Sequence, residues 1–228
     1  IVLAGYAARS KYPLIGGLRS SAQMISYEIA MGMAVIPLFL IAGGLDAGQL
    51  GAGWEKLLAG TSSLNLGRIV SWQAVHGWFI FYAPLSFVIC LAAMFAEINR
   101  MPFDLPESEQ ELAGGYNVEY SSMKFALFFM GEYANMAAAA ALMTTLFLGG
   151  WSLPVAGLDQ PATTIWAGLL HIGIFLAMMC FIIFMIIWVR WMWPRFRYDQ
   201  LMNLGWRRFI PLALANIVVT ATVLWVRS

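Results

Sequence analysis

The sequence predicts an all-α, polytopic transmembrane helix bundle, because the chain is too apolar and too weakly charged to fold in water. Hydrophobic residues make up 61% of the 228 residues and charged residues 11%, whereas ordinary globular domains hold roughly 45–50% and about 25%. The apolar residues also form long continuous runs, and Lys and Arg are distributed unequally between the segments that join them. We therefore expect a single membrane-embedded domain over residues 1–228.

Five apolar runs are long enough, or nearly so, for helices that cross about 30 Å of hydrocarbon, which takes ~20 residues. The runs are continuous and do not alternate over ~10 residues as transmembrane strands do. Residues 1–8 read as the last turns of a sixth helix, so we expect N-terminal helices to be absent from this chain. The predicted spans cover residues 20–42, 77–96, 122–148, 165–189 and 209–226, and the stretch 43–76 is predicted to be a plain connector.

The basic residues predict the orientation, because cytoplasmic loops of membrane proteins are enriched in Lys and Arg. When successive loops are assigned alternately to two sides, ten basic residues fall on one side and three on the other. The first side, with loops 9–19, 97–121 and 190–208, is therefore predicted to be cytoplasmic. Its basic residues are Arg9, Lys11, Arg19, Arg100, Lys124, Arg190, Arg195, Arg197, Arg207 and Arg208, against Lys56, Arg68 and Arg227 on the other side.

Several classes of function do not fit this composition. A net charge of +1 provides no basic surface for nucleic acid. Cys90 and Cys180 both lie inside apolar runs, so we expect no disulfide scaffold and no iron–sulfur cluster. His76 and His171 have no second ligand at metal spacing, which favours packing or a capped hydrogen bond. We expect neither a metal nor a flavin on this chain, and no signal peptide is visible at its start.

Two glutamates lie inside the predicted spans, where a charged side chain is costly. Glu28 is eight residues into its span and Glu132 ten residues into its own, which places each ~12–15 Å deep. Such residues usually face a bundle interior or a water-filled cavity and mark ion or proton pathways. The alternative is that both are permanently protonated and only donate hydrogen bonds to neighbouring helices. We expect an inward-facing pathway role.

Segment 97–121 is unusually acidic. Asp104 and Glu107 form a capping-box-like pair at the start of a short helix, but capping explains two acids and not six. Glu107 and Glu111 lie four residues apart on one face, where like charges repel and share protons. We expect a proton-loading cluster, with Arg100 as the one cation among the acids Glu97, Asp104, Glu107, Glu109, Glu111 and Glu119.

Four ordered blocks of sequence resemble the NuoH family, the H subunit of respiratory complex I that is called subunit 1 in mitochondria. The blocks are SKYPLIGGLRSSAQMISYEIAMG (10–32), EINRMPFDLPESEQELAGGYNVEYSSMKFALFFMGEY (97–133), TLFLGGW (145–151) and PRFRYDQLMNLGW (194–206). The resemblance runs over essentially the whole chain in the family's order. That family has eight transmembrane helices, so the resemblance implies that this chain starts near the end of the third.

The resemblance implies a subunit of a proton-translocating NADH:quinone oxidoreductase in the bacterial inner membrane. It implies contacts with membrane lipid, with peripheral quinone-site and iron–sulfur subunits and with adjacent small membrane subunits. The substrate would be a quinone, either ubiquinone or menaquinone, and its reduction would be coupled to proton translocation. By position in the family, the tunnel-end acids are Glu97, Asp104, Glu107, Glu109 and Glu111, the buried proton path uses Glu28, Glu119 and Glu132, and the quinone-tunnel residues are Arg19, Arg100, Phe103, Asp104 and Arg190.

Three alternatives stay open at this point. A homologous membrane subunit of an energy-converting hydrogenase or formate hydrogenlyase would carry the same buried acids without a quinone site. A free-standing ion channel or carrier would not need an acidic docking loop. A passive membrane anchor would leave Glu28 and Glu132 unexplained.

Overall fold

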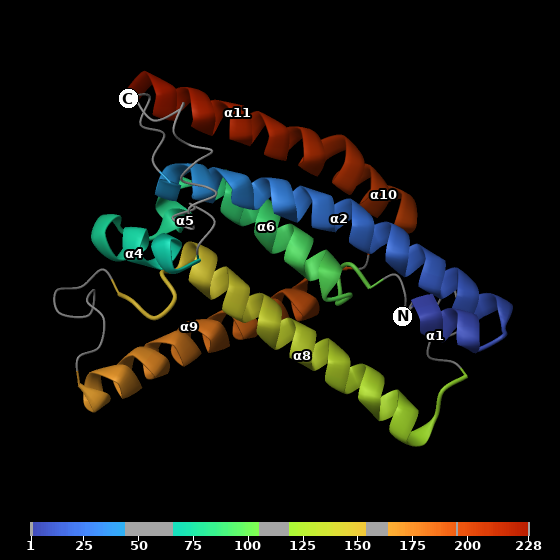
Figure 1. Ribbon diagram of the computed structural model, residues 1–228. Helices are drawn as coiled ribbons and strands as arrows, with labels where there is room; N and C mark the ends of the chain where they lie inside the picture. The colour runs from blue at the N-terminus through green and yellow to red at the C-terminus, as the bar shows by residue number, and fades with distance from the viewer. Residues whose placement is uncertain (1, 44–65, 105–118, 154–163, 195, 228) are drawn as a thin grey trace, which may run out of the picture.

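The computed structural model describes residues 2–43, 66–104, 119–153, 164–194 and 196–227, and all the regular elements in these ranges are helices (Figure 1). The predicted all-α class is therefore confirmed. In chain order the helices are α1 (Val2–Ala7), α2 (Lys11–Gly43), α4 (Leu66–His76), α5 (Phe79–Tyr82), α6 (Pro84–Glu97), α8 (Ser122–Phe147), α9 (Ile165–Met192), α10 (Tyr198–Asn203), the π-helical turn η3 (Leu204–Phe209) and α11 (Ile210–Arg227).

Four helical segments of the described chain are long and apolar enough to cross a membrane. They are Lys11–Ala42, Ser122–Phe147, Ile165–Met192 and Tyr198–Val226. Each contains one of the predicted spans almost completely, so the multi-pass prediction is confirmed. Two of them begin earlier than predicted, because polar residues at their N-terminal ends continue the helix beyond the apolar run.

The remaining predicted span, 77–96, is not one continuous helix. It consists of the single turn α5 and the 14-residue helix α6, separated at Ala83. Pro84 explains the interruption, because proline has no N–H and its ring clashes with the carbonyl four residues earlier. At 1.5 Å per residue α6 is about 21 Å long, so it crosses only part of a bilayer of about 30 Å.

The stretch 43–76 is more than the plain connector that we predicted, because residues 66–76 form α4. Its buried side chains, Ile69, Val70 and Gln73, recur at the three- to four-residue spacing of one helix face. Gln73 donates hydrogen bonds to the carbonyl oxygens of Thr145 and Leu146 at 3.2 Å each. The search for apolar runs that can cross the bilayer does not detect α4, because this helix has only 11 residues.

Helix α2 is central to the bundle, with α6 and α11 beside it and the short α1 against its N-terminal part (Figure 1). Helices α8 and α9 form a second, crossing pair that is mostly exposed in this chain. One end of the bundle gathers α1, the C-terminus of α6, the N-terminus of α8 and α10, while α4 and α5 lie at the other end. Most of the predicted functional residues belong to elements at the first of these ends.

Candidate functional site

The segment that follows α6 is folded into the bundle although it is rich in polar residues. Ile98, Asn99 and Arg100 are buried, as are Phe103 and Asp104. The amide of Phe103 donates to the carbonyl oxygen of Arg100 at 2.8 Å, which closes a turn. Asn99 adopts a positive φ of 54°, a conformation that Asn tolerates better than most residues. We refer to residues 98–104 as the coupling segment, because its backbone contacts couple the end of α6 to α2 and to the segment before α10.

Aromatic side chains join the coupling segment to the segment that precedes α10. The rings of Phe103 and Phe196 stack with centroids 5.5 Å apart, and the amide of Phe196 donates to the carbonyl oxygen of Pro102 at 3.2 Å. Tyr27 of α2 contacts Phe103 with centroids 5.8 Å apart, and its hydroxyl donates to the carbonyl oxygen of Leu201 at 3.0 Å. Two segments that the charge pattern predicts on the same side thus meet around one helix.

Arg100 forms the central ion pair of the site. Its Nη2 lies 3.1 Å from Oε2 of Glu132 on α8, and the two side chains are only 9% and 10% exposed. The guanidinium also lies over the ring of Tyr133, with its Cζ 4.9 Å from the ring centroid. Removing one partner of a buried ion pair is strongly destabilising, because the other charge is then left uncompensated. The intramembrane acid and the loop cation therefore act as one unit.

The sequence places Arg100 among the acids of its own loop and indicates no partner for Glu132. The pairing joins residues 32 positions apart on different elements, and no local pattern encodes it. One signal in the sequence could have indicated the Arg100–Glu132 pair: a single cation follows α6, and a single acid lies inside the span that forms α8. A buried carboxylate needs a compensating charge, and Arg100 is the cation that the acidic loop does not otherwise explain.

Burial raises the pKa of Glu97, at the end of α6, and the nearby Glu28 carboxylate of α2 raises it further. Glu97 is half-buried at the end of α6, whereas Glu28 is exposed on α2. Glu28 does not point into the interior of the described helices, and its role on an inward-facing path stays a prediction. The buried stripe of α2 runs through Gln23, Tyr27 and Ala30, and one residue along a helix turns the side chain by about 100°.

The other predicted residues are spread around the same end of the bundle. Arg19 is half-buried with its guanidinium 5.6 Å from the ring centroid of Tyr198. Glu119 is exposed at the approach to α8, where it lines an open hollow with Lys124, and Arg190 is exposed near the end of α9. Glu107, Glu109 and Glu111, like Arg195, lie outside the described residues.

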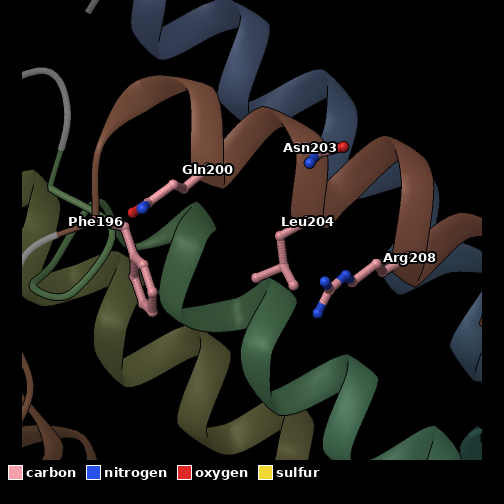
Figure 2. Close-up of a pocket in the computed structure, with 5 residues that line it drawn as sticks. All are labelled: Phe196, Gln200, Asn203, Leu204 and Arg208. Atoms are coloured by element: carbon pink, nitrogen blue, oxygen red, sulfur yellow. The ribbon is translucent and has the colours of Figure 1, made fainter.

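A small recess lies beside the coupling segment, with a volume of about 210 Å³. Figure 2 shows Phe196, Leu204 and Arg208 extending from the segment around α10 and η3 toward the side where α6 lies. Gln200 and Asn203 complete its lining. The recess is smaller than the roughly 300–1,000 Å³ of a typical ligand pocket, so it would hold only part of a ligand.

His171 is buried and its Nδ1 lies 2.9 Å from the carbonyl oxygen of Trp151, so the expected hydrogen-bonded packing is confirmed. Within the described ranges, no three His, Cys, Asp or Glu side chains lie together as metal ligands.

Gly205 allows the π-helical turn to approach α2 closely. A Cβ at this position would lie 2.5 Å from Oγ of Ser26 and 3.4 Å from the Tyr27 ring. We expect Gly205→Val to destabilise the protein by about 1–3 kcal/mol, because extra volume in a packed contact forces neighbours to shift. Thermal unfolding of the detergent-solubilised protein measures this, with Gly173→Val as the control, because a Cβ there meets nothing within 4 Å. Equal losses in both variants would contradict the close approach.

Several membrane-spanning helices, with an arginine–carboxylate pair buried at one end of the bundle, define a polytopic membrane protein with an internal charged site. The chain matches the protein family described as NADH dehydrogenase over residues 1–221. It belongs to that family, and the resemblance to the H subunits is confirmed by its relatives.

The relatives cover nearly the whole chain. It is 48% identical over 228 residues to the NADH-quinone oxidoreductase H subunit 1 of Geobacter sulfurreducens, covering 100% of this chain and 57% of the relative. It is 46% identical over 230 residues to NADH-quinone oxidoreductase subunit 8 of Rhodothermus marinus, covering 97% and 62%. For the H subunit of Streptomyces avermitilis the identity is 45%, over 100% and 46% of the two chains. The chain thus spans about half the length of its relatives.

Proposed function

We propose that this chain forms the part of an NADH-quinone oxidoreductase H subunit that couples quinone reduction to proton translocation. The observation that carries the proposal is the buried pair between Arg100 and Glu132. It connects the segment expected to border the quinone tunnel with a carboxylate inside a membrane-spanning helix. The relatives are named as quinone oxidoreductase subunits, which favours this function over the hydrogenase alternative.

The chemistry requires protons close to the quinone. Reduction of a quinone to a quinol takes up two electrons and two protons, so the charge near the coupling segment changes in each turnover. Burial and, to a lesser extent, the nearby Glu28 carboxylate raise the pKa of Glu97, so Glu97 holds a proton more readily than an exposed glutamate does. In our proposal the acids of segment 97–121 supply or sense these protons, and Phe103, Asp104 and Arg100 border the quinone with Arg19 and Arg190 nearby.

The ion pair provides a way to pass this change into the membrane. If Glu132 takes up a proton, Arg100 loses its compensating charge and a different arrangement of the coupling segment becomes favourable. If Arg100 is drawn toward a new negative charge near the quinone, Glu132 is left to accept a proton. Either event links the position of residues 98–104 to the protonation of Glu132 on α8. In this proposal the segment has two arrangements, as coupling between separate sites requires.

The proposal also includes partner subunits and an orientation. Loops 9–19, 97–121 and 190–208 face the cytoplasm of a bacterial inner membrane and dock on the peripheral quinone-site and iron–sulfur subunits. The ubiquinone or menaquinone enters from the lipid. The exposed apolar faces of α8 and α9 then contact lipid and adjacent small membrane subunits.

A photoreactive quinone analogue tests the proposed location of the quinone. We expect irradiation of the assembled membrane complex to label residues 98–104 and to be prevented by an excess of unmodified quinone. Peptide mass spectrometry identifies the labelled site, with α4 at the other end of the bundle as the internal control. Labelling of α4 alone, or labelling of the coupling segment that excess quinone does not reduce, would contradict the proposed site.

A further inference from the structure

Gln23 of α2 makes an unusual double contact with the backbone around the coupling segment. Its Nε2 donates to the carbonyl oxygen of Ala96 at 2.7 Å and to that of Phe103 at 2.8 Å. The side chain is completely buried. A buried backbone carbonyl without a hydrogen-bond partner is costly. The Gln23 amide nitrogen supplies a partner for two of them, one at the end of α6 and one in the coupling segment.

The two carbonyl groups, of Ala96 and Phe103, lie on either side of Arg100 in the sequence. Residue 96 lies at the end of α6 and residue 103 near the end of the coupling segment, so Gln23 ties both ends of a short loop to one point on α2. Arg100 lies inside that loop, and its guanidinium is held between Glu132 and Tyr133. A shift of the loop backbone would carry the guanidinium away from a 3.1 Å contact with the Glu132 carboxylate.

Gln73 offers an internal comparison at the other end of the bundle. It is also completely buried, and its Nε2 also donates to two carbonyl oxygens, those of Thr145 and Leu146, at 3.2 Å each. Its Oε1 accepts a hydrogen bond from the amide of Phe79 at 3.3 Å. Each amide thus donates to two backbone carbonyls, but Gln73 makes one hydrogen bond more than Gln23, and only Gln23 contacts the coupling segment.

We infer that Gln23 is a positioning residue for quinone-coupled proton transfer, which holds the coupling segment closed so that Arg100 stays paired with Glu132. The inference rests on the role proposed above for Arg100. It assigns Gln23 a function through Arg100 and not through contact with the quinone.

The test compares Gln23→Met with Gln73→Met in the assembled, membrane-bound complex. Methionine is unbranched and of similar length but has no N–H, so each variant loses one double contact. We expect Gln23→Met to lower kcat/KM for quinone about ten- to a hundredfold, as a misplacement of about 1 Å can, with the same division between kcat and KM as Arg100→Ala. Gln73→Met is expected to lower thermal stability and to leave quinone reduction within about twofold, because distant sites without shared partners are nearly uncoupled.

The double variant Gln23→Met/Arg100→Ala decides whether Gln23 acts through Arg100. Residues that act through one another are not additive, so we expect the double variant to be no slower than Arg100→Ala alone. If Gln23→Met does not assemble, Gln23→Asn replaces it, because the shorter amide reaches at most one carbonyl. Additive losses, or equal losses in the Gln23 and Gln73 variants, would overturn the inference. Full activity of Arg100→Ala would instead overturn the proposed function.

Discussion

Arg100→Ala is expected to lower quinone reduction by at least about tenfold while the complex still assembles. The substitution leaves the buried carboxylate of Glu132 without its cation and removes the contact with the Tyr133 ring. Removing one partner of a buried ion pair typically costs about 3–5 kcal/mol. Any reaction step that requires the Arg100–Glu132 pair therefore becomes less favourable in the variant. The measurement is quinone-dependent NADH oxidation, normalised to electron transfer from NADH to a water-soluble acceptor that bypasses the quinone.

Two further variants show whether the position or only the charge of Arg100 matters. Arg100→Lys keeps the charge but not the planar fork or the stacking on an aromatic ring, so its activity should lie between those of Arg100→Ala and the parent. Arg207→Ala removes an exposed arginine of η3 and should leave activity within about twofold, since surface substitutions usually change free energies by less than about 0.5 kcal/mol. The same loss in Arg100→Ala and Arg207→Ala would contradict a specific role for the buried pair.

Much of the fold could be predicted because membrane-spanning helices carry their own signal. Continuous apolar runs predict four of the spans, since the bilayer sets the length of a crossing helix. The runs do not predict the break at Ala83, although Pro84 is visible in the sequence. They also do not predict α4, because its short apolar face is stabilised by contacts with the end of α8 that hydropathy does not describe.

The sequence indicates candidate residues for the site, but it does not indicate which of them contact one another. The acidic segment, Arg100 and the two intramembrane glutamates were identifiable because charge is costly in a bilayer. Which partner each one has depends on how distant helices pack, and the sequence contains no local pattern for that. The buried side of α2 could not be read from polarity, because Gln23 and Ser26 are buried although they are polar, whereas Glu28 is exposed. Gln23 was overlooked because uncharged polar residues near span ends are common.

Glu132→Gln is expected to uncouple the enzyme, because glutamine keeps the shape of the side chain but cannot exchange a proton. The substitution also leaves Arg100 without its counter-charge, so a loss of activity could arise from either effect. The double variant Arg100→Met/Glu132→Gln shows how much of the lost stability comes from the unpaired cation. Replacing a buried ion pair by neutral side chains is often close to neutral for stability, so we expect stability to recover and proton translocation to stay lost.

Glu28→Gln supplies an independent comparison. Glu28 is exposed in this chain and lies near Glu97, so its replacement removes a carboxyl group without leaving a buried cation unpaired. We expect lower proton translocation in this variant with little change in thermal stability.

Glu132→Asp is the conservative control for Glu132→Gln, because a carboxylate one methylene shorter still titrates and should retain part of the coupling.

The number of protons translocated per quinone reduced, measured in vesicles that contain the assembled Glu132→Gln complex, distinguishes a coupling role of the Arg100–Glu132 pair from a structural one. The proposed coupling through Arg100 and Glu132 predicts a ratio well below that of the parent enzyme, together with slower quinone reduction and normal electron transfer to the water-soluble acceptor. A parent-like ratio at a parent-like rate would show that Glu132 is structural and that proton coupling does not pass through this ion pair.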